Sequence, residues 1–403
     1  MAKLTYLDNA ATVYPKPKEV IDFMCQFYSE KGVNPGRSGY DLCIEAESLV
    51  FETRKLLTSL FNGTDPNRLV FTYNASDSLN IIISGILKPG DHIITSNLDH
   101  NSVLRPIHHL HAKGIVEVDY IPFDNEGYID PDDVKRKIKK NTSLVIINHS
   151  SNVLGTVQPV AEIGKICREG GVIFAIDAAQ SAGVIPIDIE NMNIDVVAFT
   201  GHKSLLGPTG IGGIYVRDKI KIAQTRAGGT GVRSAYPFHL PEYPFRLEVG
   251  TINVMGIAGL NAGQKYIARR GLSNIHGKEM ELLDLFQREL SDIENVTIYG
   301  TKSLKNRMAV LSLNIKGHSA TDAGIMLDVD HNIATRTGLH CAPKAHEQLG
   351  TIQTGAVRFS IGPMNVEEDI LHAIEAVKEL ASKSSPRKRS HVEQSRGTLT
   401  SSS

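Results

Sequence analysis

The sequence predicts an α/β protein with a mainly parallel central sheet. Two observations carry this prediction: short apolar runs rich in β-branched residues recur through the first two-thirds of the chain, and amphipathic segments such as 45–61 and 131–141 separate them. A parallel strand is covered by helices on both faces, so it is apolar throughout rather than alternating. The expected strands, in chain order, lie at 68–73, 92–96, 116–123, 143–151, 171–180, 194–200 and 212–217.

After about residue 263 the pattern changes and predicts a small α+β domain. We expect the first residues of the chain to complete it. Its expected elements are a long helix, two strands, a further segment and a final helix, at 278–290, 296–300, 308–315, 318–328 and 366–382.

This change divides the chain into a large α/β domain at 15–262 and a smaller α+β domain at 1–14 plus 263–382. The remaining tail, 383–403, has five basic residues against one acidic, many serines and almost no apolar side chains. Such a segment cannot offset the entropy lost on ordering. We expect either a disordered end or a segment that docks on a partner.

The composition is that of a soluble globular protein. Of the 403 residues 41% are hydrophobic and 22% charged, and the formal net charge is −1. This balance gives no argument for nucleic acid or an anionic membrane as a partner. The start of the chain lacks the apolar core of a secretory signal. The four cysteines show no paired spacing for a zinc site or a disulfide framework, which favours a reducing, cytoplasmic setting.

Polar residues follow several of the expected strands at their carboxyl ends, where ligands bind in this fold class. Five such endings at one edge of a sheet predict a pocket. They are Asn74-Ala75-Ser76-Asp77, Asp99-His100, Asn152, Asp177 and His202-Lys203.

Lys203 lies among glycines in AFTGHKSLLGPTGIGG, residues 198–213. Glycines permit tight turns and close approach, as a lysine bonded to a flat cofactor would require. The stretch matches neither GxxxxGK[ST] nor GxGxxG, which disfavours a nucleotide site. Asp177 follows an apolar strand, where a carboxylate either caps the next turn or meets a positive partner such as a protonated pyridine nitrogen.

Four further residues have both a structural and a functional interpretation. Ser76 at a helix start is either an ordinary cap or a phosphate ligand. His100 is either structural or stacked on a ring. Arg358, inside an apolar strand, either reaches the surface or clamps a carboxylate. Cys341 is either a buried thiol or a reactive one, since its loop is polar and Arg336 and His340 are near in sequence.

Together these segments resemble the cysteine desulfurases, a branch of the class V aminotransferase-like enzymes that use pyridoxal 5'-phosphate. The resemblance runs to about residue 382 and implies fold type I of these enzymes, with a seven-stranded sheet. Its RTGLHCAP segment is similar to the branch with a short cysteine loop, which includes selenocysteine lyases. The segments that carry it are YLDNAAT, SNVLGT, DAAQSAG, TGHKSLLGPTGIGG, EVGTINV and RTGLHCAP.

The resemblance implies a cofactor site centred on Lys203, which bonds to the cofactor aldehyde and serves as the base. It implies that Asp177 pairs with the pyridine nitrogen, that His100 stacks on the ring and that Gln180 reaches the phenolic oxygen. The phosphate would meet Ala75, Ser76, His202 and, from the neighbouring subunit of a homodimer, Thr251.

For the substrate, the resemblance implies that Asn152 and Arg358 hold the carboxylate and that Arg336 supports the loop. L-Cysteine would become L-alanine, and its sulfur would pass as a persulfide on Cys341 to an acceptor protein or a thiol reductant. The alternatives are a selenocysteine lyase or another class V enzyme in which Cys341 is incidental. A more distant alternative is a non-catalytic scaffold or sulfur-binding protein.

Two positions depart from the family pattern. Relatives usually carry two threonines and a glutamate where this chain has Ala75-Ser76-Asp77, so one phosphate hydroxyl is missing and cofactor affinity is the property concerned. Asn101 follows His100 where many relatives of this branch carry a second histidine.

Overall fold

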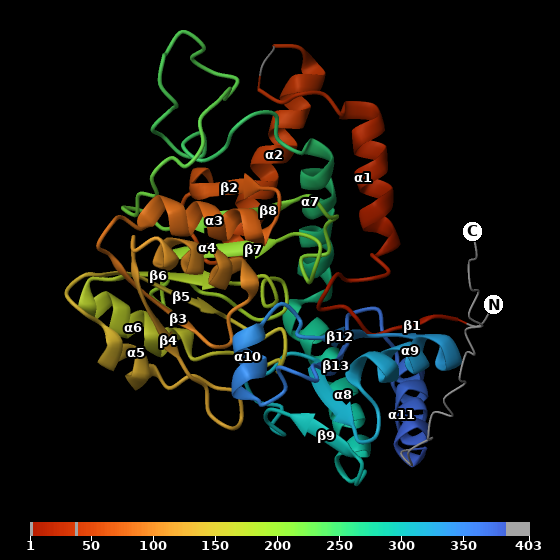
Figure 1. The fold of residues 1–403 in the computed structure, drawn as a ribbon. Helices are drawn as coiled ribbons and strands as arrows, with labels where there is room; N and C mark the ends of the chain where they lie inside the picture. The colour runs from red at the N-terminus through yellow and green to blue at the C-terminus, as the bar shows by residue number, and fades with distance from the viewer. Residues whose placement is uncertain (1–2, 37–38, 384–403) are drawn as a thin grey trace, which may run out of the picture.

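The structure, a computed structural model, describes residues 3–36 and 39–383. The predicted tail therefore lies, from residue 384 on, outside the described residues. Figure 1 shows two lobes, a larger one built on a wide sheet and a smaller one below and beside it.

The larger lobe is centred on a seven-stranded sheet. β8 pairs antiparallel with both of its neighbours, and the pairings from β7 to β4 are all parallel. The seven predicted strands are those of this sheet, so the prediction of a mainly parallel α/β sheet is confirmed. In spatial order the strands are β2 (Leu69–Thr72), β8 (Gly212–Val216), β7 (Val196–Thr200), β6 (Ile173–Asp177), β5 (Thr142–Asn148), β3 (His92–Ser96) and β4 (Glu117–Ile121).

Helices cover both faces of this sheet because successive residues of each strand point to opposite sides. In β5, Leu144 and Ile146 pack with α3 (Ala75–Ile86) and α4 (Asn101–Ala112). Val145 and Ile147 join the core on the other face. That core also receives residues from α2 (Asp41–Leu60), α5 (Pro131–Lys137), α6 (Val160–Gly170) and α7 (Val254–Arg270). α1 (Lys18–Lys31) packs on α7, and η1 (Pro66–Arg68) precedes β2.

The smaller lobe has its own apolar core around a four-stranded antiparallel sheet. Its strand order is β12 (Arg336–Gly338), β13 (Ala356–Ser360), β10 (Val310–Ile315) and β9 (Val296–Tyr299). Helices α8 (Leu272–Ser291), α9 (Ala320–His331) and α11 (Glu367–Ser382) accompany it, and β1 (Thr5–Tyr6) pairs in parallel with β11 (Ile333–Ala334). The domain boundaries given above stay a prediction.

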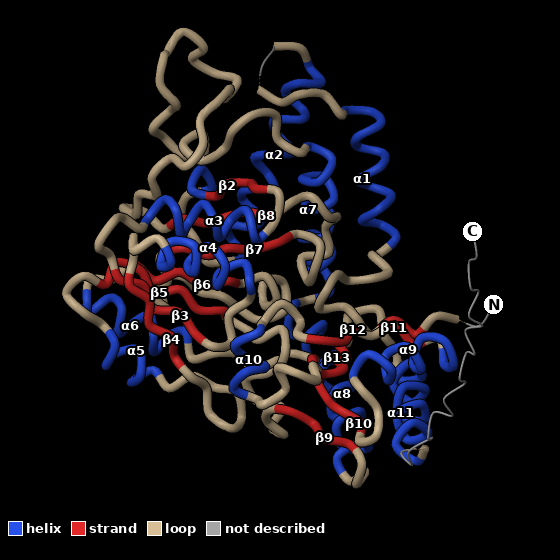
Figure 2. The backbone as a smooth tube through the Cα atoms, viewed as in Figure 1, coloured by secondary structure: helices blue, strands red, loops and turns tan. Residues whose placement is uncertain are grey.

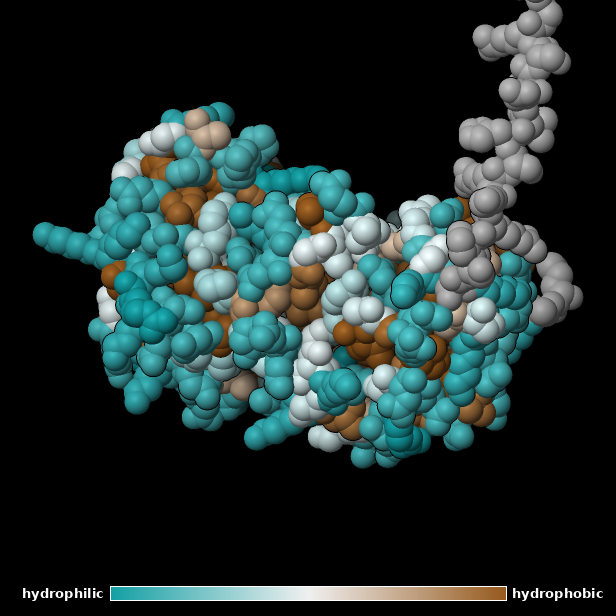
Figure 3. Space-filling view, turned by 60° about the horizontal axis from the view of Figure 1, so that its bottom comes forward, coloured by the Kyte–Doolittle hydropathy of each residue, from teal (hydrophilic) through white to brown (hydrophobic). Residues whose placement is uncertain are grey.

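The short helix α10 (Pro343–Gln348) lies between the two sheets in the tube view (Figure 2). It follows β12 directly, so the segment that contains Cys341 joins the smaller sheet to the surface of the larger lobe. Figure 3 shows a face on which hydrophilic residues dominate and apolar ones are scattered. In the described part of the chain, no helix combines the length and apolarity needed to cross a bilayer.

Candidate active site

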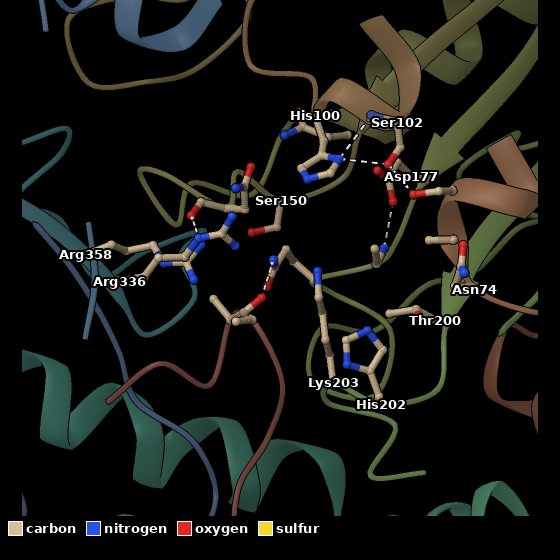
Figure 4. Close-up of a pocket in the computed structure, with 18 residues that line it drawn as sticks. Asn74, His100, Ser102, Ser150, Asp177, Thr200, His202, Lys203, Arg336 and Arg358 are labelled. Carbon is tan, nitrogen blue, oxygen red and sulfur yellow. Dashed lines mark hydrogen bonds between the residues drawn. The ribbon is translucent and has the colours of Figure 1, made fainter. Parts of the chain in front are cut away.

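Three neighbouring strands of the large sheet end in polar residues at one edge. In the register, Asn148 of β5 is level with Asp177 of β6, and β7 runs on to Thr200. All three strands are parallel, so their carboxyl ends meet there. These side chains line a cavity of about 380 Å³, which two arginines of the smaller sheet close from the other side (Figure 4).

Ten of the twelve predicted site residues line this cavity. They are Lys203, Asp177, His100, Gln180, Ala75, Ser76, His202, Asn152, Arg336 and Arg358. Cys341 is next to it, with its Sγ 3.3 Å from Nη2 of Arg336. Thr251 is exposed and borders a different, smaller hollow beside Arg226.

Lys203 and Asp177 supply an amine and a carboxylate to the same cavity. Burial lowers the pKa of Lys203 to about 8, against the opposing effect of the Asp177 charge. Burial also raises the pKa of Asp177, while an N–H donated by Ala179 at 2.9 Å and the charge of Lys203 act in the other direction. Asp177 therefore forms the local turn and also faces the cavity. The turn interpretation is confirmed, and pairing with a pyridine nitrogen stays a prediction.

The glycines near Lys203 have a packing reason that the sequence did not indicate. A Cβ at Gly212 would lie 2.8 Å from the backbone of Asn74, and one at Gly213 would lie 2.3 Å from the ring of Phe199. Gly212 thus lets the start of α3 approach β8. Gly212 and Gly213 leave space for the neighbouring backbone and side chains, and they are not part of the cavity lining.

The starts of α3 and α4 converge at one end of the cavity. Asn74 caps α3 by accepting the N–H of Asp77. Ser76 Oγ lies 2.5 Å from Ser102 Oγ, and Ser102 Oγ lies 2.8 Å from Nδ1 of His100. The N–H of Ser102 also donates to that Nδ1, so the ring carries its proton on Nε2. Burial, together with the charge of Lys203, lowers the pKa of His100 to about 4, which keeps the ring neutral.

Four buried polar atoms of the cavity lining have no partner among the described residues. Two of them, Oγ1 of Thr200 and Nδ1 of His202, come from the segment that carries Lys203, and the other two are Oδ1 of Asn148 and Nε of Arg358. Buried polar groups are nearly always hydrogen-bonded, so unpaired ones beside a cavity mark a place for a polar ligand group. Thr200 and His202 share the cavity with the first turn of α3, where Ala75 and Ser76 present a helix N-terminus that favours an anion. This set of donors fits a phosphate.

Arg358 is completely buried, which excludes the surface interpretation. Its Nη2 donates to Oδ1 of Asp8 at 2.6 Å and its Nη1 to the carbonyl of Asn152 at 3.1 Å. Arg336 faces it across the strand pair β12–β13 and has its Nη2 directed at Cys341. Two guanidinium groups at one wall make that part of the cavity suited to a carboxylate.

The backbone around Cys341 is in an unusual conformation. His340 has φ 50° and Cys341 has φ 57°, so two consecutive non-glycine residues occupy the left-handed region. The N–H of Asn101 donates to the carbonyl of Cys341 at 2.7 Å, and Nδ2 of Asn152 donates to the carbonyl of His340 at 2.7 Å. The larger lobe therefore holds the cysteine segment in place at two carbonyls.

Three residues at the cavity were not predicted from the sequence: Ser102 and Thr200, which line it, and Asp8, which pairs with Arg358. Asp8 lies in the quoted YLDNAAT segment, but its partner Arg358 is 350 positions away. Ser102 follows His100 by two positions, and Thr200 ends a strand already assigned to the pocket edge. The position of Thr200 at the carboxyl end of β7 was the signal that could have identified it.

Known proteins resemble this chain over most of its length. The family described as aminotransferase class-V matches residues 5–372. A probable cysteine desulfurase of Methanothermobacter thermautotrophicus is 34% identical over 93% of this chain and 94% of its own length. The apo structure of a cysteine desulfurase from Thermococcus onnurineus superposes with a TM-score of 0.85 at 35% identity, covering 94% of this chain and 95% of that one. The cysteine desulfurase CsdA of Escherichia coli gives the same TM-score at 27% identity, over 94% of this chain and 95% of its own.

Proposed function

The chain belongs to the class V aminotransferase family and is a cysteine desulfurase, and on that premise we propose that it converts L-cysteine to L-alanine and keeps the sulfur as a persulfide on Cys341. The observation that carries the proposal is the joint placement of the Lys203 amine and the Asp177 carboxylate in one cavity, beside a wall with two arginines. Cys341 lies within hydrogen-bonding distance of one of these arginines.

The cavity residues fit pyridoxal 5'-phosphate. The unpaired atoms of Thr200 and His202, with Ser76, suit the phosphate, and Asp177 suits a protonated ring nitrogen. When bound, this cofactor supplies an electron sink that makes the α-proton of an amino acid acidic. His100, neutral and held at Nδ1 by Ser102, has a ring oriented to stack on a flat group.

In this proposal Lys203 first holds the cofactor covalently and then moves a proton. Because burial lowers its pKa to about 8, a useful fraction of the amine is unprotonated near neutral pH and can take the α-proton of the substrate. Arg358 binds the carboxylate of the substrate, and Nδ2 of Asn152 has a second hydrogen for it besides the one donated to His340.

Cys341 then receives the sulfur. Its thiolate attacks the sulfur of the substrate, an S–S bond forms, and the C–S bond breaks with its electron pair left on carbon. The carbon framework takes up protons and leaves as alanine. Nη2 of Arg336 lies 3.3 Å from Sγ, within hydrogen-bonding distance of the sulfur that reacts. The persulfide sulfur passes to an acceptor protein or a thiol reductant.

The proposal includes a homodimer. Thr251 is exposed and outside the cavity of its own chain, as a residue that serves a neighbouring phosphate must be. A reducing, cytoplasmic compartment, inferred from the unpaired cysteines, suits an enzyme that depends on a free thiolate.

The test is an absorbance spectrum of the purified protein, incubated with pyridoxal 5'-phosphate, before and after L-cysteine is added, with alanine and sulfide measured. We expect an absorbance band at the short-wavelength end of the visible range, and Lys203→Ala should abolish it. We also expect equal amounts of alanine and sulfide in the presence of a thiol reductant. A protein that takes up no cofactor would overturn the assignment. Selenide release from selenocysteine with no sulfide from cysteine would favour the lyase alternative.

A further inference from the structure

Behind Cys341 lies a row of hydrogen-bonded side chains that the proposed reaction does not use. The ring of His340 is 3.2 Å from the ring of His346, measured from Nδ1 to Nε2. Nε2 of His340 lies 3.2 Å from the carbonyl oxygen of Arg336, and Nδ1 of His346 lies 2.8 Å from Oγ1 of Thr351. The row thus runs from Thr351, beyond the end of α10, to the residue whose guanidinium faces the thiol.

The direction of each hydrogen bond follows from the carbonyl at one end. A carbonyl only accepts, so Nε2 of His340 carries a proton and Nδ1 of the neutral ring accepts. Nε2 of His346 must then donate to it, and Nδ1 of His346 must accept from the hydroxyl of Thr351. Every polar atom of the two rings is used, and each ring has one defined tautomer.

Burial keeps this pattern intact. His340, His346 and Thr351 are 2%, 0% and 4% exposed. Burial lowers the pKa of His340 to about 3, assisted by the charges of Arg358 and Arg336, and lowers that of His346 to about 4. Both rings therefore stay neutral near neutral pH, and the donor and acceptor roles do not reverse.

The hydrogen-bonded row contacts a backbone segment whose conformation is unfavourable by itself. Two consecutive left-handed residues, His340 and Cys341, are strained and persist only where the surroundings fix them. The bonds from Asn101 and Asn152 fix the two carbonyls of this segment. The histidine row fixes the other side, since it ties the ring of His340 to the backbone of Arg336.

We propose that His346 is a positioning residue for sulfur transfer: acting through His340, it holds the left-handed turn and the backbone of Arg336 so that the guanidinium stays directed at the thiol of Cys341. His346 does not contact the thiol. This inference rests on the proposed persulfide function, because it assigns to the row a role in the chemistry of Cys341.

The test compares His346→Ala with His346→Gln, whose Nε2 can still donate to His340. The matched control is His92→Ala, since His92 is also fully buried and hydrogen-bonded to a threonine, Thr142, but lies at the opposite end of β3 from the cavity edge. Three quantities are measured on cofactor-loaded protein: kcat and KM for sulfide release, the cofactor spectrum, and the rate of Cys341 alkylation by iodoacetamide at one fixed pH.

For His346→Ala we expect kcat to fall at least about tenfold with KM for cysteine and the cofactor spectrum unchanged, because misplacing a reacting group by about 1 Å can cost about 100-fold. We also expect the rate of Cys341 alkylation to rise, because a turn that is no longer fixed releases the thiol from its contact with Arg336. His346→Gln should recover most of the rate of sulfide release. His92→Ala should leave kcat and the alkylation of Cys341 as in the wild type.

Equal effects of His346→Ala and His92→Ala, or an alkylation rate of His346→Ala identical to that of the wild type, would overturn the inference. If His346→Ala does not fold, Thr351→Val replaces it, since this variant keeps both rings but removes the last donor. Cys341→Ser separates the two hypotheses: normal sulfide release by that variant defeats the proposed function itself. An inactive Cys341→Ser beside an unaffected His346→Ala defeats only the positioning role.

Discussion

Asp8 and Arg358 form an ion pair with 2.6 Å between Oδ1 and Nη2, although 350 positions separate them in the chain. The guanidinium is completely buried, whereas the carboxylate side chain is 20% exposed. The pair links the first residues of the chain to β13 at the wall of the cavity.

Asp8→Asn should destabilise the protein. The substitution removes the negative charge and leaves a buried guanidinium with neutral oxygens as its only partners, a loss of about 1–3 kcal/mol in the free energy of unfolding. Urea unfolding of the cofactor-free protein measures it. The control is Lys3→Ala, which removes the pair of a lysine that is 76% exposed with Asp369, and we expect less than about 1 kcal/mol. Equal losses in the two variants would contradict the importance of burial.

Attachment of pyridoxal 5'-phosphate to the cofactor-free protein should accelerate as the pH rises through about 8. The neutral amine is the attacking form, and burial lowers the pKa of Lys203 to about 8, so its neutral fraction grows about tenfold between pH 7 and pH 9 and then levels off. Stopped-flow absorbance gives the rate. N-acetyl-lysine, with an ordinary amine, should keep accelerating past pH 9. A protein rate that still rises at pH 10 would mean that Lys203 is not perturbed.

Cys341→Ser should separate cofactor chemistry from sulfur transfer. The side chain lies outside the lining of the cavity, so the absorbance band that depends on Lys203 should remain. Sulfide release should fall to background because the hydroxyl is a poor acceptor of sulfur. Mass spectrometry of the wild type after a single turnover should find the added sulfur on Cys341. Cys167→Ser changes a buried thiol in α6 and should leave sulfide release unchanged.

Ser102→Ala should weaken binding of pyridoxal 5'-phosphate about fivefold, which corresponds to one lost hydrogen bond of about 1 kcal/mol. Ser102 connects Ser76 to His100 and lines the cavity, so it can supply the hydroxyl that Ala75 lacks. Spectral titration of the cofactor-free variant measures the affinity. The control is Ser48→Ala, whose hydroxyl bonds to the carbonyl of Ile44 on α2. Unchanged affinity in Ser102→Ala would remove Ser102 from the phosphate site.

Mixed dimers test the placement of Thr251. Thr251→Ala homodimers should bind the cofactor about fivefold more weakly. In a dimer of one Thr251→Ala and one Lys203→Ala subunit, the site that still has Lys203 receives the threonine of the partner subunit. Spectral titration should then give wild-type affinity at that site. If affinity stays low in the mixed dimer, Thr251 serves its own subunit.

The sequence alone determined the fold class and most of the cavity. Alternating apolar strands and amphipathic helices predict a sheet covered on both faces, and the carboxyl ends of parallel strands must meet at one edge. Asp177 and Lys203 follow two adjacent strands, so their proximity is a consequence of local sequence order together with strand pairing.

Only the tertiary structure decided which partners those residues have. Asp8 meets Arg358 because β1 pairs with β11. Ser102 lies between Ser76 and His100 because the starts of α3 and α4 converge. The histidine row lies behind Cys341. These contacts depend on the packing of distant elements at distances of about 3 Å. The spacing of apolar residues determines which face of a helix or strand each residue lies on. It does not determine which side chain of another element lies opposite.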